Sequence, residues 1–135
     1  MSGIEGQLFV CEHPTVVEAA ADELGTRCPP LVCTDGVPAL AALDLIAGVD
    51  ESRTAVRVRA DFDPTGFMIV SMVKSAAPYA EAWRFDTSTY TTYFGIDVEP
   101  GASAVEVRKS FGKDLHEEVL LPLLLADLCD AADQQ

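Results

Sequence analysis

Short apolar runs alternate along this sequence with segments whose apolar residues recur at helical spacing, and few folds are compatible with that alternation. The apolar runs have the length of strands and predict them at residues 7–11, 31–33, 55–60 and 81–85. Helices are predicted at residues 15–24, 39–47, 67–77, 87–94 and 115–132, with a loop at residues 95–113. Such an order is typical of an α/β fold with an open, mainly parallel four-stranded sheet and helices on both faces. We expect the strand order 2-1-3-4, in which the winding reverses between the first and third strands.

The chain has 135 residues, and we expect a single domain over residues 1–135. Hydrophobic residues make up 49% of it, enough to bury a core, which excludes intrinsic disorder. No apolar run approaches the roughly 18 residues that span a membrane, and the first residues lack the pattern of a secretory signal. We expect residues 1–6 to be a disordered or tag-like N-terminus and residues 129–135 to be a frayed C-terminus.

The cysteines indicate a reducing compartment. There are four of them, without a Cys-x-x-Cys pair: Cys11, Cys28, Cys33 and Cys129. Three adjoin apolar residues of predicted strands or helices, which favours reduced core thiols over a zinc site. Together with the lack of a signal, this predicts a cytoplasmic protein that does not contact a membrane.

The balance of charge is strongly acidic. Asp and Glu number 22 against 9 Lys and Arg, which gives a net charge of −13 at pH 7. A domain that grips duplex DNA normally presents a basic face, so we expect this chain alone to bind nucleic acid weakly. The acidic residues either serve solubility or collect at a divalent-metal site.

Acidic residues lie within three residues after the ends of three predicted strands. Glu12 follows the first strand, Asp35 the second, and Asp61 and Asp63 the third. In an open α/β sheet, ligands bind outside the carboxyl ends of the strands, where the winding reverses. With the order 2-1-3-4, Glu12 faces Asp61 and Asp63 across that crevice.

Carboxylates gathered in one crevice repel one another and stay ionised only beside a cation. Oxygen ligands favour Mg²⁺ or Mn²⁺ over zinc, and such ions commonly serve phosphoryl transfer or phosphodiester cleavage. Taken singly, each acid has an ordinary explanation, because acids cap helices and the run Asp61–Gly66 could be a plain turn. Glu12 and the two aspartates together, on neighbouring strands, favour the metal site.

A strand ending in Glu, then a strand ending in Asp-x-Asp with a Pro or Gly after it, resembles the Toprim domain of topoisomerases, primases and related nucleases. The run Asp61-Phe-Asp-Pro-Thr-Gly66 resembles the form found in the topoisomerase VI A subunit. The order of LFVCEHPTVVEAAADELGTRCPPLVCTDG, the DFD turn, AWRFDTSTY and LHEEVLLPLLLADL is similar to the C-terminal domain of the JetD nuclease subunit of bacterial Wadjet plasmid-defence systems. That likeness covers residues 7–128, most of the chain.

The resemblance implies a Toprim-like fold and metal-dependent DNA cleavage within an anti-plasmid defence complex. It implies that Glu12 does general acid/base or metal work and that Asp61 and Asp63 hold Mg²⁺ or Mn²⁺. Glu117, in a His-Glu-Glu run shared with the JetD-like group, would support or complete the site; the alternative is an acid favoured at a helix start. We interpret His13 as a loop residue, and a general base is the alternative.

The resemblance also implies partners. JetD-like proteins carry an additional DNA-binding part ahead of this domain and act with a condensin-like ATPase complex. Arg57 and Arg59 share one face of the third strand, since side chains alternate along a strand, and they contact either DNA phosphate or acids within the fold. The many leucines of the last helix suit either the core or a homodimer surface.

Two other functions fit parts of the sequence. One is a catalytically silent Toprim module that mediates assembly or binding. The other is a haloacid-dehalogenase-like phosphatase, in which Asp61 is the nucleophile and Asp63 the general acid. That family places its Asp-x-Asp-x-Thr motif on the first strand, whereas here the motif follows the third.

Overall fold

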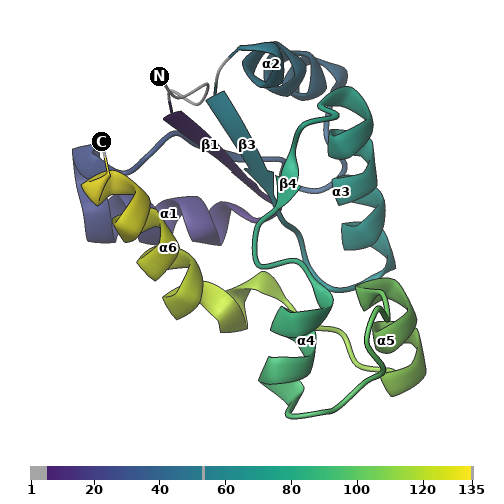
Figure 1. The fold of residues 1–135 in the computed structure, drawn as a ribbon. Helices are drawn as coiled ribbons and strands as arrows, with labels where there is room; N and C mark the ends of the chain where they lie inside the picture. Colours follow the sequence, from purple (N-terminus) through teal and green to yellow (C-terminus); the bar gives the residue numbers. More distant parts are fainter. Residues whose placement is uncertain (1–5, 53, 135) are drawn as a thin grey trace.

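The structure is a computed structural model that describes residues 6–52 and 54–134 (Figure 1). One sheet contains four strands, β1 (Gly6–Cys11), β2 (Leu31–Cys33), β3 (Thr54–Val58) and β4 (Glu81–Ala82). All neighbouring strands are parallel, and their order is β2-β1-β3-β4. The predicted fold class and the order 2-1-3-4 are therefore confirmed, and the architecture is the one expected of a Toprim-like domain.

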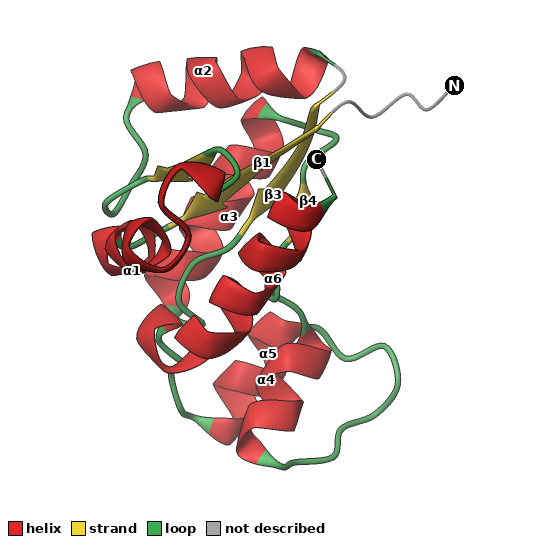
Figure 2. Ribbon diagram, turned by 90° about the vertical axis from the view of Figure 1, so that its left-hand side faces the viewer, coloured by secondary structure: helices red, strands yellow, loops and turns green. Residues whose placement is uncertain are grey.

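Helices cover both faces of the sheet. They are α1 (Pro14–Leu24), α2 (Leu40–Glu51), α3 (Pro64–Ala76), α4 (Thr87–Phe94), α5 (Ala104–Phe111) and α6 (Leu121–Asp133), with short 3-10 turns at η1 (Gly25–Arg27) and η2 (Glu117–Leu120). Helix α1 packs beside α6, and α2 packs beside α3 on the other face (Figures 1 and 2). The chain moves from β1 to β2 and then back across β1 to β3, so right-handed crossovers place α1 and α2 on opposite faces. None of the described helices could cross a membrane.

The fourth strand is shorter than the predicted 81–85. Only Glu81 and Ala82 pair with β3, because Arg84 adopts a left-handed backbone conformation, with φ of 49°, that ends the strand. Trp83 turns into the core instead, where its ring lies 4.7 Å from that of Phe9. Phe85 is also buried and stacks on Phe62 at 4.7 Å.

Residues 95–113, predicted as a loop, contain α5. Ser103 accepts a hydrogen bond from the backbone N–H of Glu106, and the pair forms the Ser-x-x-Glu pattern that starts helices. Gly112 ends α5 in a left-handed conformation, with φ of 80°. Helices α4 and α5 lie together beyond the carboxyl ends of the central strands (Figures 1 and 2).

The last helix begins later than predicted. Leu115 forms an isolated antiparallel bridge with Phe62, and α6 starts only at Leu121, where Pro122 occupies the first turn. The expected fraying of residues 129–135 is wrong for 129–133, which belong to α6 and include the buried Ala131. At the other end Gly6 already opens β1, and residues 1–5 lie outside the described part.

Candidate metal centre

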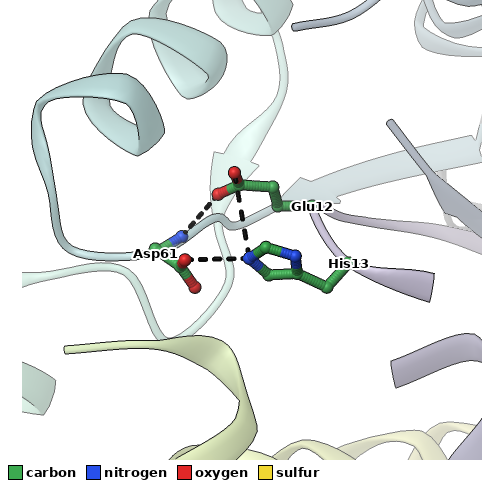
Figure 3. Close-up of side chains that lie close together, drawn as sticks. All are labelled: Glu12, His13 and Asp61. Atoms are coloured by element: carbon green, nitrogen blue, oxygen red, sulfur yellow. Dashed lines mark hydrogen bonds and ion pairs between the residues drawn. The ribbon is translucent and has the colours of Figure 1, made fainter. Parts of the chain in front are cut away.

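The carboxyl ends of β1 and β3 bring Glu12 and Asp61 into contact. The two strands are adjacent and parallel, with Val10 opposite Val58, so the residues after them leave the sheet at the same edge. The backbone N–H of Asp61 donates to Oε1 of Glu12 at 3.0 Å (Figure 3). Only 6% of Glu12 and 4% of Asp61 is exposed, so both acids are held inside the protein.

Two imidazoles converge on one oxygen of Asp61. Nε2 of His13 lies 2.8 Å from Oδ2 of Asp61, and Nδ1 of His116 lies 3.0 Å from the same atom. The other carboxylate oxygen, Oδ1, accepts the backbone N–H of Glu117 at 2.7 Å. Burial by itself would raise the pKa of Asp61, but these hydrogen bonds outweigh it and lower that pKa. Asp61 is therefore an ionised carboxylate at neutral pH.

The two histidines become more basic in return. Burial acts to lower the pKa of His13, but the hydrogen bond to Asp61 and the charges of Asp61 and Glu12 raise it. The hydrogen bond to Asp61 likewise raises the pKa of His116. Both rings reach solvent, with 34% of the His13 side chain and 59% of the His116 side chain exposed.

Glu12 differs from Asp61 in its ionisation. Burial raises the pKa of Glu12, and the negative charges of Asp61 and Asp63 add to the increase. The N–H of Asp61 and the charge of His13 oppose it only in part. A raised pKa brings a carboxyl group closer to the range in which general acids and bases work.

The run from Asp61 to Gly66 is a strand-to-helix turn in which several residues have a physical role. Asp63 caps α3, because its Oδ1 accepts the backbone N–H of Gly66 at 2.6 Å. Pro64 occupies the first turn of the helix, where its missing N–H costs nothing. A Cβ on Gly66 would lie 1.8 Å from the carbonyl oxygen of Asp61, so only glycine fits against this turn.

Glu117 holds the backbone of the loop that follows β1. Its oxygens accept the backbone N–H groups of Glu12, at 3.1 and 3.2 Å, and of His13, at 2.9 Å. Nε of Arg59 donates to the same carboxylate at 3.0 Å, and both side chains are fully buried. Burial raises the pKa of Glu117, which the Arg59 guanidinium and the two N–H groups oppose. Glu117 thus fixes the loop after β1, and within the described residues it belongs to neither group able to hold an ion.

The remaining candidates lie elsewhere. Asp35 is exposed, with φ of 53°; its N–H donates to the carbonyl of Glu12 at 2.9 Å, but its carboxylate joins neither described ion-binding group. Arg59 was expected to contact either DNA or acids, and it contacts Glu117; its complete burial makes the DNA contact wrong. Arg57 is half-buried on the same face of β3, and its Nε has no hydrogen-bond partner among the described residues.

A family model described as "Protein of unknown function C-terminus (DUF2399)" matches residues 2–128. The chain belongs to the DUF2399 family. The matched span contains every residue of the site described above. A search of the curated proteins finds no match.

Among the described residues of this DUF2399 domain, two groups of side chains could hold a metal ion. One contains Glu12, His13 and Asp61, and the other contains Asp61, Asp63 and His116. Within each group the ligand atoms lie within 4.8 Å of one another. Carboxylate oxygens are the ligands that Mg²⁺ and Mn²⁺ prefer, so the donor set fits the ion expected from the sequence.

The two histidines are the residues of the DUF2399 site whose position the sequence did not reveal. His13 adjoins Glu12 and precedes Pro14, which gave a weak local signal for a residue at the strand end. His116 is 55 residues from Asp61, and its position depends on the bridge between Phe62 and Leu115. No local pattern predicts that contact, although the His-Glu-Glu run that begins at His116 was a signal for this segment.

Proposed function

We propose that this chain is the metal-dependent nuclease module of a JetD-like protein, with a Toprim-type site that cleaves DNA. The observation that carries the proposal is the contact of Glu12 with Asp61 at the carboxyl ends of β1 and β3. Asp63 lies in the same turn, and its ligand atoms are near those of Asp61. The family match spans residues 2–128, nearly the same stretch as the resemblance to JetD in the sequence.

Each acid has a role in this proposal. A bound Mg²⁺ or Mn²⁺ would polarise the phosphate and lower the pKa of a water molecule. Asp61, ionised and nearly buried, and Asp63, whose second oxygen is not needed by the helix cap, would hold that ion. Glu12, with its raised pKa, would move the proton of the attacking water. Glu117 and Arg59 would keep the loop after β1 in place.

Binding of DNA requires more than this chain. The net charge of −13 repels a polyanion, and Arg59 is occupied by Glu117. We therefore assign DNA binding to a separate DNA-binding part. We propose that the protein acts within a condensin-like ATPase complex in the bacterial cytoplasm. Arg57 is the candidate for a local contact with phosphate.

A plasmid-nicking assay tests the proposal. Supercoiled plasmid is incubated in Mn²⁺ or Mg²⁺ with the chain joined to the DNA-binding part of a JetD-like protein, and the variants Glu12→Ala and Asp61→Asn are compared with Asp35→Asn. The control is matched because Asn tolerates the left-handed conformation at position 35 and also removes one charge. We expect nicking in the wild type and in Asp35→Asn, and its loss in the other two.

Other outcomes contradict the nuclease. Nicking that survives Glu12→Ala and Asp61→Asn would come from a contaminant or another site. No nicking even when the chain is joined to a DNA-binding JetD-like part would favour the silent assembly module. Release of phosphate from a small phosphomonoester, lost in Asp61→Asn, would favour the phosphatase instead.

A further inference from the structure

The imidazoles of His13 and His116 both approach the carboxylate cluster. Each contributes one nitrogen to a different ion-binding group, and Asp61 belongs to both groups. Their ring nitrogens lie 2.8 and 3.0 Å from the same atom, Oδ2 of Asp61. The cluster is therefore two triads of ligands joined at one carboxylate.

These separations match those of neighbouring ligands on a metal ion. Ligand atoms about 2.1 Å from an ion and at right angles to each other lie about 3.0 Å apart. A hydrogen bond has the same length, so without an ion each imidazole N–H can donate to Asp61 at the distance seen here. Exchange of the proton for an ion then requires little movement of His13 or His116.

Glu12 contributes a second feature that suits a cation. It is 6% exposed, and its Oε1 accepts the N–H of Asp61. Its other oxygen, Oε2, faces Nε2 of His13 at 3.8 Å, which is beyond hydrogen-bond distance. A nearly buried carboxylate oxygen thus points at the same nitrogen that approaches Asp61, and an ion between them could bind all three groups.

We propose that His13 and His116 are ligands of the metal centre formed with Glu12, Asp61 and Asp63. The proposal rests on the metal site of the proposed function and adds the class of ion. Imidazole nitrogen binds Mn²⁺ and the later divalent transition ions better than it binds Mg²⁺. The centre therefore prefers a divalent transition ion, and Mn²⁺ is the member of that class closest to Mg²⁺.

Calorimetric titration without DNA tests this directly. MnCl₂ and MgCl₂ are titrated separately into the 135-residue chain and into His13→Ala, His116→Ala and Asp35→Asn, each checked for its fold by circular dichroism. We expect Mn²⁺ to bind at least about tenfold more tightly than Mg²⁺. Each histidine variant loses at least about tenfold in affinity for Mn²⁺, and Asp35→Asn changes nothing. Removal of a ligand should cost no less than the 10–100-fold known for residues that only orient ligands.

The contrary results separate this inference from the proposed function. Equal affinities for Mn²⁺ and Mg²⁺, with both histidine variants like the wild type, would overturn the histidine ligands but leave a carboxylate metal site. No binding of either ion would overturn both proposals. Electron paramagnetic resonance of free Mn²⁺ in the same samples counts the bound ions independently.

Discussion

The carboxylates of Asp61 and Asp127 are both held by side chains from distant segments, but they face different groups. Asp127 accepts two hydrogen bonds from the guanidinium of Arg84, both at 2.9 Å. The indole N–H of Trp83 donates to it at 2.9 Å as well. Burial acts to raise the pKa of Asp127, yet Arg84 and Trp83 lower it. A permanent positive charge therefore neutralises this acid.

The surroundings of Asp61 contain no such permanent charge within the two described ion-binding groups. Asp61 shares them with Glu12 and Asp63, and the only cationic partners there are the imidazoles of His13 and His116. Imidazoles titrate near neutral pH, unlike guanidinium. Three carboxylates thus face two partners that can each lose their charge.

This difference indicates which cluster is structural and which is functional. The Asp127 site, defined here as Trp83, Arg84 and Asp127, is complete as it stands and joins α6 to the segment after β4. The Asp61 site, defined here as the residues of the two ion-binding groups, keeps an excess of negative charge. A divalent cation is the partner that we propose for such a site.

The largest effect is expected when the buried ion pair of Arg59 and Glu117, which supports the Asp61 site, is broken. Arg59→Met leaves Glu117 buried without its cation, so we expect the free energy of unfolding to fall by about 3–5 kcal/mol. Urea denaturation measures it. The matched control is Arg27→Met, because Arg27 and Asp133 form a pair that is 61% and 67% exposed. Arg27→Met should lower the free energy of unfolding by less than about 1 kcal/mol. Equal losses in the two variants would contradict the structural role of the buried pair.

The next effect concerns the turn that carries Asp61. In Gly66→Ala the new Cβ meets the carbonyl oxygen of Asp61, so the turn must move, and we expect a loss of about 1–3 kcal/mol. Gly48→Ala is the control, since Gly48 lies within α2 with nothing within 4 Å of a new Cβ. Gly48→Ala should raise the free energy of unfolding by roughly 0.5–1 kcal/mol. Thermal unfolding compares them, and a stabilised Gly66→Ala would show that the close approach is not real.

The smallest effect belongs to the Asp127 site. The pKa of Asp127 is lowered in the folded protein. The ionised Asp127 therefore contributes to stability above the unfolded pKa of about 3.9, and this contribution disappears as pH falls through the lower folded pKa. We expect Asp127→Asn to cost about 1 kcal/mol at pH 7 and nothing well below pH 3.9. Urea denaturation at several pH values measures this. A cost that persists at low pH would mean that the charge of Asp127 is not what Arg84 recognises.

The sheet and the meeting of acids could be foreseen because they depend on local patterns and on one topological rule. The alternation of elements predicted a parallel sheet, and the order 2-1-3-4 is one of the few that right-handed crossovers allow. With that order, adjacent strand ends place Glu12 near Asp61. Helix α5 could also have been found, since Ser103 and Glu106 carry its start signal.

The partners of the charged residues could not be foreseen. Arg59 directly follows β3, two residues after Arg57, and nothing near it in the sequence indicates Glu117, which is 58 residues away. The short β4 depends on the left-handed conformation of Arg84, a residue type that seldom adopts it. These features arise from packing between distant segments, which no local pattern encodes.

The central claim is that the Asp61 site binds a divalent cation and that the Asp127 site does not. Calorimetric titration of Mn²⁺ into Asp61→Asn and Asp127→Asn tests it most directly, because each variant removes one negative charge and little volume. The account predicts that Asp61→Asn weakens binding at least about tenfold while Asp127→Asn binds as the wild type does. Equal affinity in both variants, or a loss confined to Asp127→Asn, would contradict it.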